Sequence, residues 1–418
     1  MRFFILLLLF CACFALCEDR FPKPEFENGH SIPSPTEPMP RSSLWQYTDI
    51  GVLFLSLSLA SYLALKIRSR KAVFLLSLFC LGYFGFYKKG CICPIGAIQN
   101  ISLSLFDMQF ALPIAALIIF FLPLVYALLF GRMFCSCVCP LGVLQDLFAI
   151  KPLEIKRWVA LPLRLLAYLY LGLAILLSST GSAFIICQYD PFVAFFRFSG
   201  KPEIILLGIA FLLTGIFLAR PYCRFFCPYG VLLGWLSRIS FWHVNITPQD
   251  CISCRLCEKT CPFGSILPPT EEKPKESRSQ GIYRLAMLFL LLPFLVFLGS
   301  WSIGKLYIPL SKMHRTVSLA ERIHAEESGK KAGTILESKT FRSLGKTNEA
   351  LYQEAMGIRY QFFIGTHILG ALVGLYIGVQ AILFSLHRIR NAYTINQSQC
   401  FSCARCFASC PVKIPHSR

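Results

Sequence analysis

Long apolar stretches, separated by short polar and basic segments, dominate this sequence. A helix that crosses the hydrocarbon core of a bilayer needs about 20 mostly apolar residues. Seven stretches approach or reach this length, and they lie near residues 46–65, 72–87, 110–131, 158–178, 203–219, 282–303 and 359–386. The pattern predicts a mainly α-helical, multi-pass membrane protein with about six to seven spans.

Three further segments are not predicted to be spans of the membrane domain. Residues 1–17 carry one arginine before an apolar run, which is typical of a secretion signal peptide, with a retained anchor as the alternative. Residues 18–45 are rich in Pro, Ser and Glu without periodicity, which predicts a disordered extracytoplasmic leader. Residues 304–358 mix both signs of charge densely, which favours a solvated helical extracytoplasmic insert between two transmembrane helices at 282–303 and 359–386.

The amino-acid composition supports a location in the bilayer, and the distribution of basic residues suggests how the spans are oriented. The 418 residues are 55% hydrophobic and 15% charged, and the net charge is +19. Basic residues cluster after the first span, at 66–71, as expected on the cytoplasmic side. Lys88 and Lys89 then fall outside, against the trend. No basic, aromatic-interleaved soluble face is evident, so nucleic acid is not an expected partner.

Twenty cysteines are present, and eight of them form two identical runs. Each run has the spacing Cys-x2-Cys-x2-Cys-x3-Cys-Pro, and the cysteines are Cys251, Cys254, Cys257 and Cys261 in segment 241–281, and Cys400, Cys403, Cys406 and Cys410 in segment 387–418. This is the spacing of bacterial ferredoxins, whose thiolates hold [4Fe-4S] clusters. Four thiolates also suit zinc, but zinc ribbons favour two separated Cys-x2-Cys pairs. We therefore expect two [4Fe-4S] clusters.

The fourth cysteine of each run raises a question of pairing. In two-cluster ferredoxins it ligates the cluster of the other run. Two predicted spans lie between the runs and return the chain to one face. Cys261 could thus complete the site of Cys400, Cys403 and Cys406, and Cys410 that of the first run.

A second motif, Cys-x3-Cys-Pro-x-Gly, occurs twice within the membrane domain predicted at 46–240. The cysteines are Cys135 and Cys139 in one copy and Cys223 and Cys227 in the other. Both copies follow an apolar stretch and a basic residue, so both are expected at the inner boundary of the membrane. Together they would supply four thiolates for a third iron-sulfur cluster. The alternative is that they are small buried hydrophobic residues.

A degenerate third copy reads Cys91-Ile-Cys93-Pro94-Ile-Gly96, and Cys137, between Cys135 and Cys139, aligns with Cys91. Alternation of the spans places Cys91, Cys93 and Cys187 on the outer side. A metal site and a disulfide both remain open for these thiols.

With these motifs, the chain resembles the membrane-bound polyferredoxins grouped with the nitrous-oxide-reductase regulator and the quinol-oxidising subunit of periplasmic nitrate reduction. The likeness covers residues 46–418. It implies a prokaryotic cytoplasmic membrane protein with cytoplasmic clusters that passes electrons from quinol or cytoplasmic donors toward extracytoplasmic reductases or flavin carriers. Regulator-type members carry a flavin domain before the spans, for which residues 18–45 are too short, so a flavoprotein partner would be a separate chain.

These features favour electron transfer between redox partner proteins, with no catalytic residue and no stand-alone catalysis. An accessory factor that reduces or assembles a partner metalloenzyme is the alternative. A transporter finds little support, because the spans hold few ionisable residues.

Overall fold

The computed structural model describes residues 42–90, 94–107, 110, 112–150, 152–153, 155, 157–246, 251–270, 277–330, 333–343, 345, 347–386 and 389–412. The predicted signal peptide, nearly all of the predicted leader, and Cys91 and Cys93 lie outside these residues.

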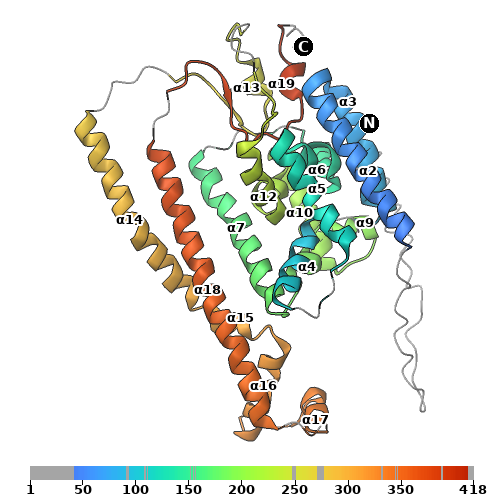
Figure 1. Cartoon of the computed structure of the whole chain (residues 1–418), viewed down its shortest axis with the longest axis vertical. Coiled ribbons are helices and arrows are strands. Elements are labelled where there is room, and N and C mark those ends of the chain that lie inside the picture. The colour runs from blue at the N-terminus through green and yellow to red at the C-terminus, as the bar shows by residue number, and fades with distance from the viewer. Residues whose placement is uncertain are drawn as a thin grey trace.

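Seven helical stretches correspond to the seven predicted spans (Figure 1). They are α2 (Ser43–Tyr62) with η1 (Leu63–Ile67), α3 (Arg70–Cys80) with η2 (Leu81–Tyr87), α5 (Ile114–Phe130), α7 (Arg157–Ser179), α10 (Pro202–Phe217), α14 (Arg278–Gly304) and α18 (Asn348–Ser385). Five of them are long and apolar enough to cross a membrane, while α5 and α10 are shorter apolar helices. The predicted class, a multi-pass helical membrane protein, is confirmed.

Short helices follow several of the spans. They are α4 (Pro94–Phe106), η3 (Phe134–Val138), α6 (Pro140–Phe148), α8 (Ile185–Tyr189), α9 (Val193–Arg197), α11 (Pro221–Phe225), α12 (Pro228–Leu236) and η4 (Ser237–Ile239). In α6 and α12 a proline directly after a cysteine is the first helical residue. Proline fits this position because its φ is already helical and its missing N–H would have no partner there. The Cys-Pro pairs therefore place a cysteine at the start of each of these two helices.

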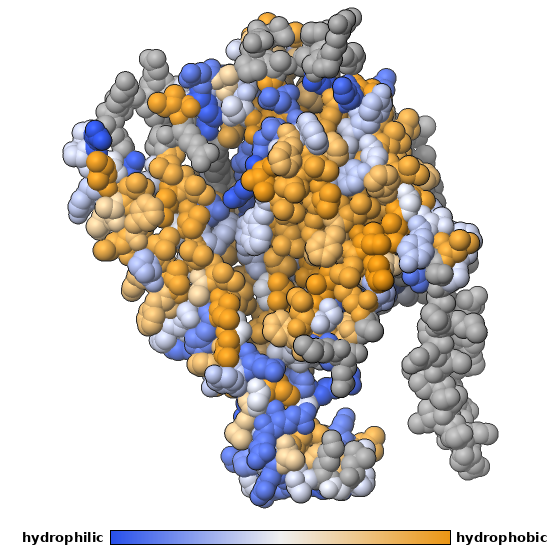
Figure 2. Space-filling model, in the orientation of Figure 1, coloured by the Kyte–Doolittle hydropathy of each residue, from blue (hydrophilic) through white to orange (hydrophobic). Residues whose placement is uncertain are grey.

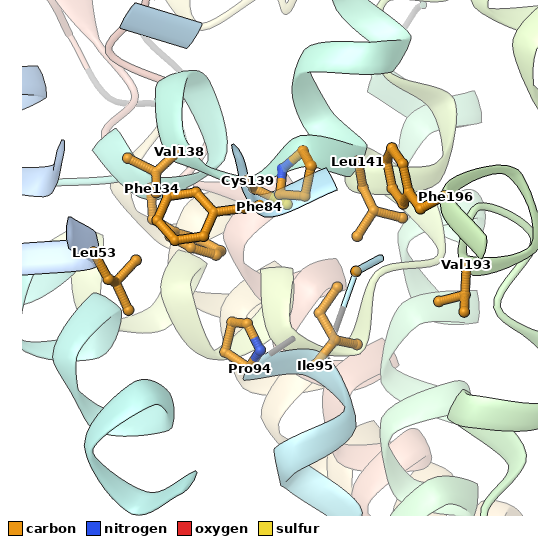
Figure 3. A pocket seen from close by; sticks show the side chains of 12 residues that line it. Leu53, Phe84, Pro94, Ile95, Phe134, Val138, Cys139, Leu141, Val193 and Phe196 are labelled. Carbon is orange, nitrogen blue, oxygen red and sulfur yellow. The ribbon is translucent and has the colours of Figure 1, made fainter. Parts of the chain in front are cut away.

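The helices α4 and α6 start close together and then diverge. Pro94 and Ile95 of α4, with Pro140 and Leu141 of α6, line one cavity of about 20 Å³ (Figure 3). Further along α6, Asp146 contacts the C-terminal cysteine segment, whereas α4 extends toward the opposite end of the membrane domain (Figure 1). The two helices thus point their N-termini at each other from opposite directions.

The last two spans, α14 and α18, pack closely on each other. A side chain at Gly370 would collide with the carbonyl oxygen of Gly299, and one at Gly374 with that of Leu295. Small residues at four-residue spacing allow this approach. Gly370 and Gly374 thus belong to a helix-packing surface.

The insert between these spans is helical, as expected, and has a core of its own. It contains α15 (Tyr307–Ser311), α16 (Arg315–Glu327), α17 (Leu336–Ser343) and the first turns of α18, which begins at Asn348 rather than near 359. Val317, Ile323, Phe341 and Leu351 form its buried centre. Figure 2 shows a mostly hydrophilic surface here, in contrast to the hydrophobic surface of the spans.

The two cysteine runs lie together at the other end of the molecule (Figure 1). Their elements are α13 (Leu256–Thr260) with β1 (Ile266–Leu267), and β2 (Thr394–Ile395) with α19 (Arg405–Ala408). β1 and β2 pair in antiparallel fashion, with Ile266 opposite Ile395. Segments on either side of the α14–α18 hairpin therefore form one small ferredoxin-like unit.

Lys88, which disagreed with the charge pattern, is explained by a local partner. Its Nζ lies 2.6 Å from Asp49 Oδ1, and both side chains are almost fully buried. The carboxylate of Asp49 thus compensates the burial of the Lys88 charge.

Candidate iron-sulfur centres

The two ferredoxin-type loops share an unusual backbone conformation. Ser253 and Arg255 flank the second cysteine of the first run, and Ser402 and Ala404 flank that of the second run. All four have φ between +54° and +59°, although none is glycine. This left-handed region is costly for residues with a Cβ and concentrates at functional sites. The shared conformation wraps each loop around a common centre.

Around the first run, cysteines of both runs line one cavity. Cys251, Cys254 and Cys257 line this cavity of about 40 Å³, together with Cys406 and the fourth cysteine of the second run, Cys410. The fourth cysteine of the first run is absent from this lining. The arrangement is the exchange of fourth cysteines that the ferredoxin spacing predicts.

Around the second run, the same exchange occurs in reverse. Burial, together with the neighbouring Cys403 and Cys261, raises the pKa of Cys400 to about 12, although hydrogen bonds from Ser402 lower it. Burial also raises the pKa of Cys406, as do Cys400, Cys403 and Cys261. Cys261 therefore lies with the thiols of the second run. Cationic iron would allow all four to ionise together.

The two Cys-x3-Cys-Pro boxes bring their four cysteines together inside the membrane domain. Cys139 lies within electrostatic range of Cys223, Cys135 and Cys227. All four are buried. We call this group the inner site; its residues are Cys135, Cys139, Cys223 and Cys227.

Hydrogen-bond donors point at the sulfurs of the inner site. Gln145 Nε2 lies 3.3 Å from Cys223 Sγ. Gly230 N lies 3.3 Å from Cys227 Sγ, and Arg132 Nη2 lies 3.9 Å from Cys135 Sγ. Such donors stabilise thiolate charge and tune the potential of a cluster.

An approximate two-fold relation explains the glycine of each box. A Cβ at Gly142 would lie 2.6 Å from Cys135 O and 3.4 Å from Arg220 Nη1. A Cβ at Gly230 would lie 3.2 Å from both Cys223 O and Arg132 Nη2. Each glycine thus makes room for its own first cysteine and for the arginine that precedes the other box.

Two aromatic rings of the cysteine runs cover the inner site. The Phe401 ring packs against Phe263, with centroids 4.5 Å apart and ring planes tilted by 42°. The Arg132 guanidinium lies 4.4 Å from the Phe401 centroid, and that of Arg220 lies 5.4 Å from it. Phe401 directly follows Cys400 of the second run, and Arg132 contacts both the Phe401 ring and Cys135 of the inner site. The Phe401 ring and the Arg132 guanidinium therefore connect the two sites.

A buried carboxylate fixes this contact. Asp146 lies 2.9 Å from Arg70, 3.0 Å from Arg405 and 3.4 Å from Arg220. Burial alone would raise the pKa of Asp146, but the guanidiniums of Arg220, Arg405 and Arg70 together lower it well below its usual value. The carboxylate therefore stays ionised and joins α6 to α19.

Gln145, Asp146 and the two arginines did not emerge from the cysteine spacing. Extending the comparison of the Cys-Pro motifs toward the C-terminus would have indicated Gln145. Gln99 occupies the equivalent position after Cys93-Pro94. Asp146 has no such signal, since its three partners come from distant parts of the chain.

Among the described residues, no three His, Cys, Asp or Glu side chains converge closely enough to hold a single metal ion. The expectation of clusters rather than zinc therefore rests on the spacing of the cysteine runs.

Comparison with known proteins supports this chemistry. Residues 112–156 and 201–246 each match the family described as 4Fe-4S binding domain. The two matches include Cys135 and Cys139, and Cys223 and Cys227, respectively, and neither includes a ferredoxin-type run.

Three relatives are similar over part of the chain. A protein of Escherichia coli (strain K12) named "Putative electron transport protein YccM" is 31% identical over 116 residues, which cover 25% of this chain and 32% of the relative. Uncharacterized protein MJ0750 of Methanocaldococcus jannaschii is 32% identical over 98 residues, 23% of this chain and 41% of the relative. Protein NirI of Paracoccus denitrificans (strain Pd 1222) is 34% identical over 101 residues, 23% of this chain and 15% of the relative.

The matches thus span well under half of each relative, and no solved structure matches the chain. Together the 4Fe-4S binding domains and the relatives confirm the predicted resemblance to membrane iron-sulfur proteins of electron transport. The number of clusters and the ligand role of each cysteine remain predictions.

Proposed function

We propose that this protein relays electrons between redox partners through three iron-sulfur clusters, held by the first run with Cys410, by the second run with Cys261, and by the inner site. Bound clusters would supply one-electron reduction and oxidation steps. The exchange of Cys261 and Cys410 between the runs carries the proposal, because it completes two four-thiol sets.

The protein's own groups set the conditions for this relay. Arg132 and Arg220 place positive charge beside the inner site and beside the second run. Phe263 and Phe401 shield the space between these sites from water. Where fixed protein charges replace water around redox centres, the centres can change charge without a reorientation of solvent.

A cavity beside the inner site supports a quinol as one partner. It measures about 80 Å³ and is lined by Cys223, Cys227, Arg164, Tyr168 and Trp235, among others. Trp235 Nε1 donates to Tyr168 OH at 3.1 Å. Aromatic and hydrogen-bonding groups at the end of membrane helices suit a quinol headgroup, and the adjoining thiols mark the electron acceptor.

Cytoplasmic placement of the ferredoxin-like unit and an extracytoplasmic redox partner, such as a separate flavoprotein, complete the proposal.

The test is chemical analysis of the anaerobically purified full chain, followed by reduction. Three cubanes correspond to about 12 iron and 12 acid-labile sulfide per chain, and two to about eight of each. We expect the higher value, with reduction by a quinol analogue as well as by dithionite. Stoichiometric zinc with negligible iron would overturn the proposal. Clusters that dithionite reduces but no quinol analogue reduces would remove quinol as the donor.

A further inference from the structure

The repeat around the third Cys-Pro motif continues beyond its cysteines. Positions 91–100 read Cys-Ile-Cys-Pro-Ile-Gly-Ala-Ile-Gln-Asn, and positions 137–146 read Cys-Val-Cys-Pro-Leu-Gly-Val-Leu-Gln-Asp. Gln99 therefore corresponds to Gln145, and Gly96 to Gly142. The helices that carry them, α4 and α6, run in opposite directions from a shared cavity. This half of the membrane domain is an inverted copy of the unit that builds the inner site.

The two glutamines make the same contact with a cysteine helix. Gln145 Oε1 accepts from Tyr222 N at 3.0 Å, directly before Cys223. Gln99 Oε1 accepts from Ile186 N at 3.1 Å, directly before Cys187. Cys187 is the third residue of the five-residue helix α8, as Cys223 is of the five-residue helix α11. Cys187 is thus the positional counterpart of an inner-site cysteine.

An acidic residue occupies the place of the second cysteine. Cys227-Pro228 begins four positions after Cys223, and Asp190-Pro191 begins three positions after Cys187, so Asp190 corresponds to Cys227 as the residue before the proline but at a spacing one residue shorter. Asp190 is 3% exposed, and its Oδ1 accepts from Phe192 N at 2.9 Å. Carboxylate, like thiolate, is a common ligand of divalent metals.

Two buried polar atoms beside Cys187 have no hydrogen-bond partner. They are Nε2 of Gln99, a residue with no exposed surface, and Oδ2 of Asp190. In the inner site, Nε2 of Gln145 instead donates to Cys223 Sγ. A buried polar atom without a partner is unfavourable and requires an explanation, such as a bound group. A Cβ on Gly96 would lie 3.4 Å from Cys187 Sγ, so the thiol faces the first turn of α4.

We propose that Cys187, Asp190 and Gln99 form part of a further metal site, distinct from the three cluster sites, with Cys187 and Asp190 as ligands and Gln99 as a positioning residue. It would take a thiophilic divalent metal such as Zn²⁺ or Fe²⁺, which mixed sulfur and oxygen donors bind well. This outer site would lie on the side of the membrane domain away from the ferredoxin-like unit.

The test uses the full chain in detergent under anaerobic conditions. Binding of added Zn²⁺ and Fe²⁺ would be measured by equilibrium dialysis with elemental analysis, and Cys187 would be probed with N-ethylmaleimide and mass spectrometry. We expect metal to protect Cys187 from alkylation. Asp190→Asn should weaken this protection at least tenfold in metal concentration, and Cys187→Ser should remove one bound metal per chain.

Cys80→Ser is the matched control, because Cys80 is buried and belongs to no motif. It should leave metal binding and Cys187 protection unchanged. The spectrum of the inner-site cluster reports whether each variant is folded. Alkylation of Cys187 that is independent of added metal, with equal metal content in the wild type and Cys187→Ser, would overturn the proposal.

Discussion

At the residue scale, Gln145 connects the two Cys-Pro boxes through both ends of its amide. Its Oε1 accepts from Tyr222 N and its Nε2 lies 3.3 Å from Cys223 Sγ. A donor to a ligating sulfur stabilises the reduced, more negative cluster. The side chain thus contacts both the backbone of α11 and a sulfur of the proposed inner-site cluster.

We predict that Gln145→Leu lowers the midpoint potential of the inner-site cluster. Loss of one hydrogen bond to a charged sulfur corresponds to a shift of tens of millivolts, since about 59 mV is a tenfold change for one electron. Redox titration monitored by electron paramagnetic resonance measures the shift. Gln99→Leu is the control and should leave this signal in place; equal shifts in both variants would contradict the assignment.

Asp146 gives a prediction of pH dependence. Its pKa is lowered in the folded protein by Arg220, Arg405 and Arg70, which outweigh the effect of burial. A carboxyl with a lowered pKa contributes stability above its unfolded pKa of about 3.9, and this contribution is lost as the pH falls toward the folded pKa. The wild type should therefore lose stability below about pH 4.

In Asp146→Asn this acid-dependent step should be smaller. The variant leaves three arginines without their carboxylate, so we expect a loss of about 3–5 kcal/mol at neutral pH. Thermal unfolding followed across pH 3–7 by circular dichroism measures both effects. An acid transition of the same size in the variant would exclude Asp146 as its source.

At the scale of single elements, the sequence predicted spans better than their ends. The apolar pattern indicated all seven helical stretches, because each must bury its backbone hydrogen bonds within lipid. It did not indicate that α18 extends ahead of residue 359, since this part packs on α16 through amphipathic contacts rather than in lipid.

The α14–α18 pair provides a test of packing. Gly374→Val should separate the helices, because a side chain there meets the Leu295 carbonyl. Overpacking of this kind costs about 1–3 kcal/mol. Gly357→Ala lies on the same helix in open space and should be neutral or slightly stabilising. Detergent thermal-shift measurements would compare the two, and equal melting temperatures would contradict the close-packed interface.

At the scale of the whole molecule, one ferredoxin-like unit is assembled from segments that lie on both sides of a membrane hairpin. β1 and β2 join them, and Cys261 and Cys410 each cross to the other run. The stability of this unit therefore depends on the α14–α18 hairpin that brings its halves together.

We predict that Cys410→Ser disturbs the cluster of Cys251, Cys254 and Cys257, whereas Cys261→Ser disturbs that of the second run. A serine oxygen is a poorer ligand for iron than a thiolate. Mössbauer or electron paramagnetic resonance spectra of the two variants distinguish the clusters. Damage confined to the run that carries the substitution would refute the exchange.

The sequence by itself determined the membrane class, the spans and the cysteine sets, because these depend on apolar length and on ligand spacing along a continuous segment. It left open whether the boxes meet, what donates to their sulfurs and which residues lie beside Cys187. Only the tertiary structure decided these points, since Gln145, Asp146, Arg220 and Phe401 contact residues distant in the chain. Contacts of this kind arise from packing and burial, and local patterns do not say which distant residues meet.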